Sequence, residues 1–321
     1  MGARRYVARK VVQAATTLAF VLTFNFFLFR VLPGDPVGLL AKSQRLTEAD
    51  VASLQAELGL DQPLASQYVT YVRQTLTGNL GVSLRTARSV TSTIWSSIGP
   101  TVLLVGLGTL FATVIGIWIG IKGGWRRGSR FDSSLLYGSL ALYSIPEGWL
   151  GMILLLVLSG TLGLFPAGGF ETGGRTGTAR FVDVLNHLFL PVLTLTLGYV
   201  GQYAIIMRSS MIDVINEDYV TSARAKGVPE HMVRRNHVVP NAFLPTFTLI
   251  FLNFGFVLGG AIVVEAVFSW PGLGLLTYGA INALDFPVIQ GVFLLSSAAV
   301  IVFNLMADVT YGYLDPRVRE A

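Results

Sequence analysis

The sequence predicts an all-α polytopic membrane protein with six transmembrane helices, and three observations carry that prediction. First, 52% of the 321 residues are hydrophobic and the mean hydropathy is +0.62, well above the values of a water-soluble domain of this length. Second, only 13% of the residues are charged, and they gather in short clusters beside apolar runs. Third, six apolar segments have the ~20 residues that a helix needs to cross a hydrocarbon core of ~30 Å.

The predicted spans cover residues 10–32, 98–121, 132–162, 187–207, 242–266 and 286–311. The third span is interrupted by the stretch SIPEGW around Pro146. Because proline removes a backbone donor and kinks or breaks a helix, and because two spans do not fit into this segment, we interpret it as one kinked or broken span.

The distribution of basic residues predicts the orientation of the spans. With the amino terminus inside, the cytoplasmic stretches are residues 1–9, 122–131, 208–241 and the tail after residue 311. Together with Lys10 they hold 15 Lys and Arg, against 7 in the outer connections. This positive-inside bias places both termini in the cytoplasm. The alternative, that the first span is a signal peptide, is disfavoured by its length and by the lack of a small-x-small cleavage site.

Residues 33–97 are predicted to form a small helical insertion outside the membrane, between spans 1 and 2. In LTEADVASLQAELGL, Thr47 and Asp50 have capping-box spacing and Gly59 is a stop signal. A second helix is predicted in DQPLASQYVTYVRQTLTGN, closed by Gly78, from the four-residue spacing of Leu64, Tyr68, Val72 and Leu76. Two interpretations remain open: a cap packed on the ends of the spans, or a docking surface for a protein that delivers substrate.

The connection 208–241 is much longer than the ordinary ~4–6 residues, and such loops usually carry structure or function. Residues 211–226 are compatible with a helix that ends at Gly227, and Pro229 can begin a second helix, over about 230–239, that Pro240 stops. Val220, Ala223, Met232 and Val233 are available for a buried face. The hypothesis is a stiff finger that transmits force. The alternative is a plain loop whose basic residues only set topology.

This connection resembles the coupling motif of ABC importer permeases, in which a Glu-Ala-Ala-like triplet is followed by a glycine and, further on, by a Leu-Pro-like pair. Glutamate is absent at Thr221, and His237 stands where the motif is hydrophobic. The residues that match the motif or lie within it, and that the resemblance implies in coupling, are Thr221, Ser222, Ala223, Arg224, Ala225, Lys226, Gly227, Val239 and Pro240.

Further stretches along nearly the whole chain are similar to the peptide-importer branch of that family: LPGDP, LGLDQPLASQYVTYV, LTGNLGVS, LGLFPAGG, VEAVFSWPGLG, DFPVIQG and NLMADVTYGYLDPRVR. The chain is thereby similar to the first of the two permease subunits of a dipeptide or oligopeptide importer. The same branch includes permeases for nickel chelates and glutathione, so these substrates stay open.

The resemblance implies a type I permease fold in a prokaryotic cytoplasmic membrane, surrounded by lipid. It also implies a heterodimer with a second, homologous permease, separate ATP-binding subunits that hold ATP and Mg, and an extracytoplasmic substrate-binding protein. The chain itself is expected to be no enzyme, because it contains no GxxxxGK[ST] phosphate-binding motif and no catalytic constellation. Because the chain has no cysteine and only three histidines, neither a cofactor nor a metal centre is expected. A nucleic-acid partner is not expected either.

The resulting division of the chain is residues 1–32 with the first span, 33–97 as the insertion, 98–311 as the permease core and 312–321 as a cytoplasmic tail. Within the core, Glu147 beside Ser144 is predicted to face the translocation cavity and to meet the amino group of a passing peptide, since a charge at mid-bilayer is costly unless it faces a cavity or partner. The alternative, equally open, is a carboxyl satisfied by Ser144 or by backbone groups freed at the kink. Glu265 is expected to reach the membrane interface, and Asp308 to lie near the inner end of the sixth span.

A docking or gating role is predicted for the stretch FSWPGLGLLTYGAINALDFP, which can form a re-entrant piece packed between spans. Its candidate residues are Trp270, Pro271, Gly272, Gly274 and Asp285. The competing function is an ion-coupled secondary transporter that acts alone, which would need polar residues near the midplane in two matched halves. The sequence contains no such internal repeat.

Overall fold

The computed structural model describes residues 3–31, 47, 49, 61–257 and 261–314 of the chain. The described residues form helices and one isolated β-bridge, between Val82 and Ser89, so the all-α prediction is confirmed. The predicted helix within residues 46–60 lies outside the described residues. The long helical units are α1 (Ala3–Val31), α5 (Val90–Trp125), the bent unit of α6 (Arg130–Ser144) with α7 (Glu147–Leu154) and η1 (Leu155–Thr161), α8 (Gly177–Ile215), α11 (Val239–Val257) and α14 (Phe286–Leu314).

Five single helices in the described part are long and apolar enough to cross a membrane, and the number becomes six when the bent unit counts as one span. The shorter elements are α4 (Leu64–Leu76), α9 (Asp218–Ala225), α10 (Glu230–Met232), the π-helical η2 (Val233–Val238), α12 (Ile262–Val267) and α13 (Leu273–Asn282). Helix α4 matches its prediction, and Gly78 directly after it has the positive φ of +78° that a stop requires.

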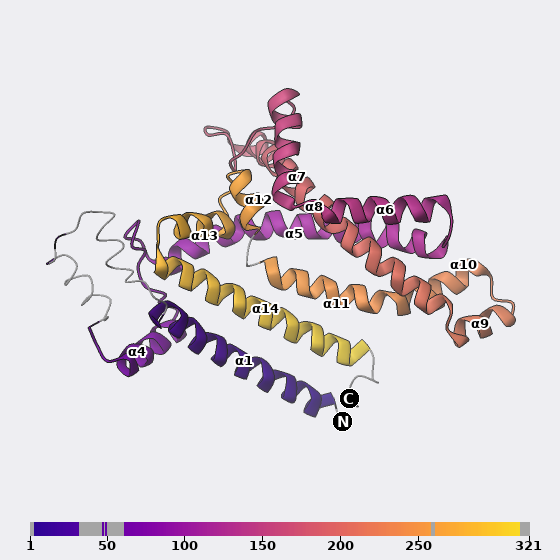
Figure 1. Ribbon diagram of the computed structural model, residues 1–321, viewed down its shortest axis with the longest axis horizontal. Helices are drawn as coiled ribbons and strands as arrows, with labels where there is room; N and C mark the ends of the chain where they lie inside the picture. Colours follow the sequence, from indigo (N-terminus) through magenta and orange to yellow (C-terminus); the bar gives the residue numbers. More distant parts are fainter. Residues whose placement is uncertain (1–2, 32–46, 48, 50–60, 258–260, 315–321) are drawn as a thin grey trace.

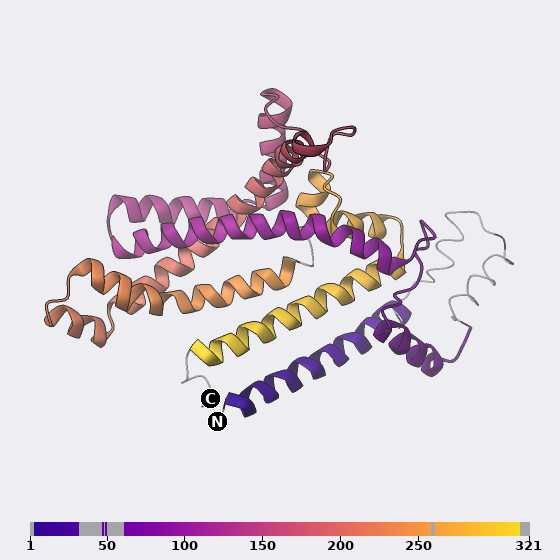
Figure 2. The ribbon, with the colours of Figure 1, turned by 180° about the vertical axis from the view of Figure 1, so that it is seen from behind.

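The long helices share one general direction, so the bundle has two ends (Figure 1). We call the end that carries α9 the finger end, and the end that carries α4 and α13 the far end. Helices α5 and α8 form the centre, α11 and α14 lie beside them, and α1 lies against α14 at the flank. The first turns of α1 and the last turns of α14 lie side by side toward the finger end (Figure 2).

The central pair α5 and α8 packs through a stripe of small residues at every fourth position of α5. These residues are Gly108, Ala112, Gly116, Gly120 and Gly124, all buried. A Cβ atom added to Gly116 would lie 2.5 Å from the Cβ of Tyr203, and one added to Gly120 would lie 2.6 Å from the Cβ of Met207. The two helix backbones therefore approach as closely as small-xxx-small contacts allow in membranes.

The third span is broken where the sequence predicts, at Pro146. Helices α6 and α7 enclose an angle of 95°, so α7 and η1 project sideways from the bundle (Figure 1). Ile145 is extended (φ −84°, ψ 123°) because a following proline disfavours the helical conformation, and Pro146 precedes the first residue of α7.

Two sequence-based boundaries are wrong. The predicted fifth span, 242–266, is not one helix: α11 ends at Val257, and α12 is a separate element that packs on α13. In addition, Pro240 does not stop a helix, because α10, η2 and α11 follow one another without interruption. The wide π-helical turns of η2 come immediately before Pro240, where an ordinary α-turn would bring the proline ring against the carbonyl of Asn236.

Two ion pairs tie helices together near the finger end. Lys10 Nζ lies 2.9 Å from Asp308 Oδ2 and joins α1 to α14, and the hydroxyl of Tyr6 donates to the carbonyl of Asp308. Arg208 donates to Asp132 through Nη2 (2.8 Å) and joins α8 to α6. Asp308 therefore joins α14 to α1 through both its side chain and its carbonyl.

Candidate functional site

The finger is the segment 216–239, which connects α8 to α11 through α9, a tight turn, α10 and η2. Helix α9 ends in a Schellman motif: the N–H of Val228 donates to the carbonyl of Ala223 (3.2 Å), and the N–H of Gly227 to that of Arg224 (2.9 Å). Gly227 has φ +80°, which a glycine adopts without strain. Pro229 then precedes α10, so the turn is built from the predicted glycine and proline.

The finger is anchored on the end of α8 by a small apolar core. Its buried members are Met207, Met211, Val220, Ala223, Val233, Val238 and Ala242. Met232, expected on this face, is instead 45% exposed. Across the turn, Arg224 Nε lies 2.9 Å from Glu230 Oε1, which links α9 to α10. Since α9 and η2 share one core with α8, the finger is a continuation of the bundle and not a loose loop.

Most of the residues predicted for coupling lie on the surface of the finger. Ala223 is buried, and Val239 is half-buried. The exposed ones are Thr221, Ser222, Arg224, Ala225, Lys226, Gly227 and Pro240. The structure therefore gathers residues 221–227 at the tip of the finger, whereas Val239 and Pro240 lie at its base, where α11 begins. The tip is thus connected to α8 through the shared apolar core and to α11 through η2.

A second polar site lies at the far end, around Glu265 of α12. Its side chain is fully buried, so the expectation that it reaches the membrane interface is wrong. One carboxylate oxygen accepts from the hydroxyl of Thr101 (2.9 Å), and the other from the N–H of Leu275 (3.0 Å). Thr101 in turn accepts from the N–H of Leu273 (2.7 Å). Glu265 therefore joins α12 to α13 and to the part of α5 around Thr101, because its two oxygens accept from groups of both neighbours.

The residues predicted as a gate are placed around this carboxylate. Trp270 is fully buried and donates from Nε1 to the carbonyl of Pro100 (2.9 Å). A Cβ atom on Gly272 would come within 2.6 Å of the carboxyl carbon of Glu265, and one on Gly274 would lie 2.7 Å from Cα of Ile262. Both positions therefore favour glycine, whereas Pro271, directly before Gly272, is exposed.

Asp285 lies on the other side of α13, at the start of α14, and is buried. Its carboxylate accepts from the hydroxyl of Ser83 (2.5 Å) and from the N–H groups of Leu84 (3.1 Å) and Arg85 (3.4 Å). It thereby fastens the turn 83–88 to the bundle. Asp285 and Trp270 are both buried and hold the far end together from within, and their role in docking or gating stays a prediction.

We predict that Glu265→Leu destabilises the protein by roughly 3 kcal/mol or more, because it leaves the hydroxyl of Thr101 and the N–H of Leu275 buried without an acceptor, at ~1–3 kcal/mol each. Thermal unfolding of the detergent-purified protein measures this effect. The matched variant Glu265→Gln keeps one acceptor oxygen and should lose distinctly less stability than Glu265→Leu. Equal stability of the Leu variant and the wild type would contradict this assignment of the carboxylate.

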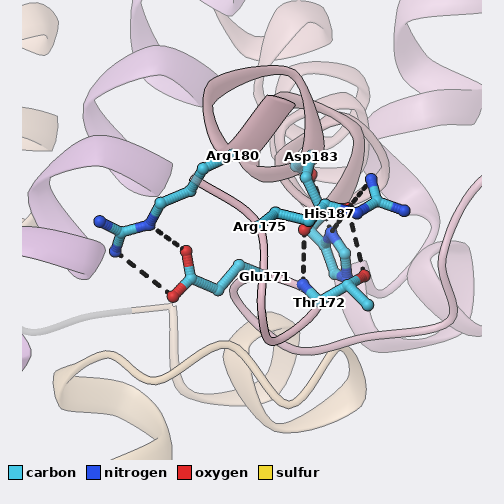
Figure 3. A network of polar contacts seen from close by, with 6 residues as sticks. All are labelled: Glu171, Thr172, Arg175, Arg180, Asp183 and His187. Carbon is cyan, nitrogen blue, oxygen red and sulfur yellow. Dashed lines mark hydrogen bonds and ion pairs between the residues drawn. The ribbon is translucent and has the colours of Figure 1, made fainter. Parts of the chain in front are cut away.

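The segment 163–176 is fastened to the far end by a network that sequence reasoning did not find (Figure 3). Asp183 stands at its centre and accepts from the hydroxyl of Thr172 (3.1 Å) and from Arg175 Nη1 (2.7 Å), and Glu171 pairs with Arg180 beside it. The partners are eight to eleven residues apart, outside helical spacing, so the sequence carried no periodic signal for them.

The same segment also contacts the hairpin of α12 and α13. The N–H of Gly169 donates to the carbonyl of Phe268 (2.9 Å), and the rings of Phe170 and Trp270 lie 4.9 Å apart. The far end is therefore one connected assembly, in which the hairpin, the segment 163–176 and the part of α5 around Pro100 support one another.

Glu147 is half-buried at the start of α7, against α8. A Cβ atom on Gly198 would lie 3.2 Å from its Cγ, and the side chain of Tyr199 is hydrogen-bonded to its carboxylate. Ser144 is not its partner, because the Ser144 hydroxyl donates to the carbonyl of Leu140 (2.7 Å). That Glu147 and Ser144 face a translocation cavity stays a prediction. Among the described residues, no group of three or more His, Asp or Glu side chains is arranged to hold a metal ion.

Comparison with known proteins gives matches along nearly the whole chain. Residues 112–320 match the family model described as binding-protein-dependent transport system inner membrane component, and residues 3–105 match the model for the N-terminal region of such membrane components. Both the finger and the gate residues fall within the first match.

Full-length relatives are similar over the same extent. A di/tripeptide transport system permease protein of Pseudomonas aeruginosa is 36% identical over 330 residues, which cover 98% of each chain. The dipeptide transport system permease protein of Escherichia coli K12 is 33% identical over 334 residues, again 98% of each chain. An oligopeptide transport system permease protein of Bacillus subtilis is 34% identical over 314 residues, with the same coverage.

Proposed function

The chain belongs to the family of binding-protein-dependent transport system inner membrane components, and from this premise we propose that it is the transmembrane permease subunit of an ATP-driven importer of di- or oligopeptides. Peptides are preferred over nickel chelates and glutathione because the three relatives above are named for peptide transport. The observation that carries the proposal is the finger, an anchored and projecting surface that ends in the residues of the coupling motif.

We place the finger end in the cytoplasm of a prokaryotic cell, together with both termini. This orientation puts 15 Lys and Arg on the cytoplasmic side and 7 on the other, in the sense of the positive-inside rule. The far end then faces the outside, where a substrate-binding protein delivers its cargo.

In the proposed mechanism, the tip of the finger (residues 221–227) sits on a separate ATP-binding subunit, which holds ATP and Mg and supplies the energy. Movement of the tip passes through the apolar core around Met207 and Met211 into α8. Helix α8 carries α5 with it, because their backbones are in contact along the glycine stripe. A second, homologous permease completes the pathway as a heterodimer.

The proposal is tested by crosslinking from the finger. The chain contains no cysteine, so a single introduced cysteine reports on one position. We expect Ala225→Cys and Lys226→Cys to crosslink to an ATP-hydrolysing protein in native membranes, with a yield that changes when ATP is added. Leu76→Cys in α4, where the side chain is 78% exposed at the far end, is the control and should not capture that protein.

Failure of both finger positions to capture an ATP-hydrolysing neighbour, in membranes where all three cysteines react with a small thiol reagent, would contradict the coupling role. Peptide uptake by this chain reconstituted alone would instead identify an ion-coupled secondary transporter.

A further inference from the structure

The far end contains a hollow of about 250 Å³ between the turn 83–88, the first turns of α5 and helix α13. Its floor is apolar and includes Leu275, Leu276 and Val288. Its wall is polar and includes Ser83, Arg85 and Thr86. The hollow is large enough for one long side chain, but it is smaller than the ~300–1,000 Å³ of ordinary small-molecule pockets.

The hydroxyl groups that line the hollow already donate their hydrogens to other groups of the protein. Ser83 donates to Asp285 (2.5 Å), and Thr86 donates to Ser83 (2.9 Å). Thr93 and Ser97, deeper along α5, donate to backbone carbonyls of Ser89 (3.0 Å) and Thr93 (3.1 Å). Since each hydroxyl has one hydrogen, these groups offer only acceptors to an incoming group.

Arg85 supplies the free donors of the hollow. Its side chain is exposed, and within the described part of the chain no acidic side chain pairs with it. Its Nη1 lies 3.7 Å from the position of a Cβ atom on Gly279, so the guanidinium reaches over α13 at a residue without a side chain. The nearby carboxylate of Asp285 is already occupied by three donors from residues 83–85. A planar guanidinium with free N–H groups selects a carboxylate, which it can bind with two parallel hydrogen bonds.

The backbone around the hollow is strained. In the part of the chain that the structure describes, three residues other than glycine have positive φ: Ala87 (52°), Ser269 (50°) and Leu284 (54°). Ala87 follows Thr86, Leu284 precedes Asp285, and Ser269 lies two residues before Pro271, which also lines the hollow. All three unfavourable conformations thus border one site, as is common where a backbone is held for binding.

The apolar residues that line the hollow beside Arg85 include Pro271, which is exposed, and Leu276. An apolar lining around a charged anchor is the composition of a protein interface centre, where Arg is enriched. This favours a protein partner over a free peptide.

We propose that this hollow receives the carboxylate of an Asp or Glu side chain on the surface of the extracytoplasmic substrate-binding protein, bound by the guanidinium of Arg85, with the methylene groups of that side chain on the apolar floor. The inference rests on the proposed function, because it needs the far end to face the outside and a binding protein to dock there.

The test uses the complete transporter in lipid nanodiscs and the binding protein whose addition stimulates its ATP hydrolysis. We expect Arg85→Glu to weaken the affinity for that binding protein at least tenfold and to reduce the salt dependence of its association rate. Arg88→Glu is the matched control: it has the same charge change three residues away, outside the lining, and should change the affinity less than threefold. A single Asp or Glu→Lys substitution on the binding protein should restore affinity for Arg85→Glu only.

Equal affinities of the Arg85→Glu and Arg88→Glu transporters would overturn the inference while leaving the proposed function intact. So would a loss of peptide uptake with unchanged affinity for the binding protein, because the hollow would then contact substrate. A wild-type complex that hydrolyses no ATP in response to any binding protein would overturn the proposed function and this inference together.

Discussion

Gly227→Val should reduce ATP-driven peptide uptake at least tenfold while the helices stay inserted. The glycine has φ +80°, a conformation that costs a residue with a Cβ roughly 1–2 kcal/mol, and a β-branched side chain fits there worst. No atom lies within 4 Å of a Cβ added at this position, so the effect comes from the backbone and not from a clash. Relaxation of the turn breaks the Schellman bonds from Val228 and Gly227 and redirects the tip of the finger.

Uptake and ATP hydrolysis measured in parallel in proteoliposomes check this prediction, and hydrolysis should continue without uptake. Gly227→Asn is the matched control, because asparagine tolerates the left-handed conformation far better than valine, and it should lose much less uptake. If the valine and asparagine variants transport equally well, the geometry of this turn is not what couples the subunits.

Gly116→Ala should cost about 3 kcal/mol or more of stability, although it adds a single methyl group. The new Cβ would lie 2.5 Å from the Cβ of Tyr203 and 2.9 Å from the carbonyl oxygen of Val200. The carbonyl belongs to the backbone of α8 and cannot rotate away, so the two helices have to separate. Overpacking of this kind typically costs ~1–3 kcal/mol, and more where backbone has to shift.

Thermal unfolding of the detergent-purified protein, and the amount of folded protein in membranes, measure the effect. Gly106→Ala on the same helix is the control, since no atom lies within 4 Å of its added Cβ. That variant should be neutral or stabilised by up to ~1 kcal/mol, as alanine is the better helix former. Comparable losses of stability in both variants would show that α5 is sensitive to any substitution, and that the effect is not specific to its contact with α8.

Local chemistry explains which parts of the fold and of the finger could be predicted from the sequence. The length of an apolar run determines whether a helix can span the membrane, and a glycine and a proline two residues apart define the turn at Gly227 and Pro229. The break at Pro146 is likewise a property of one residue and its predecessor.

The remaining features depend on residues distant in sequence. The apolar run 242–266 continues past the end of α11, so hydropathy could not show that α12 breaks away to pack on α13. Glu265 looked like an interfacial carboxylate because the groups that donate to it, the hydroxyl of Thr101 and the N–H of Leu275, come from other elements. The small residues of α5 recur at every fourth position of the sequence. Only the opposing residues of α8 in the structure show that this stripe is a helix–helix contact. Pro240 resembled a stop because the widened turns of η2 that accommodate it leave no sequence signature.

The flank position of α1 bears on how the protein is made. Its main neighbour is α14, and it is joined there by Lys10 and Asp308, near opposite ends of the chain. Among the described helices α1 is synthesised first and α14 last, so α1 lacks this partner until α14 has been made. Before that point its main contacts in the described part of the chain are those with α4, so we expect a nascent chain cut short before α14 to leave most of the packing surface of α1 uncovered.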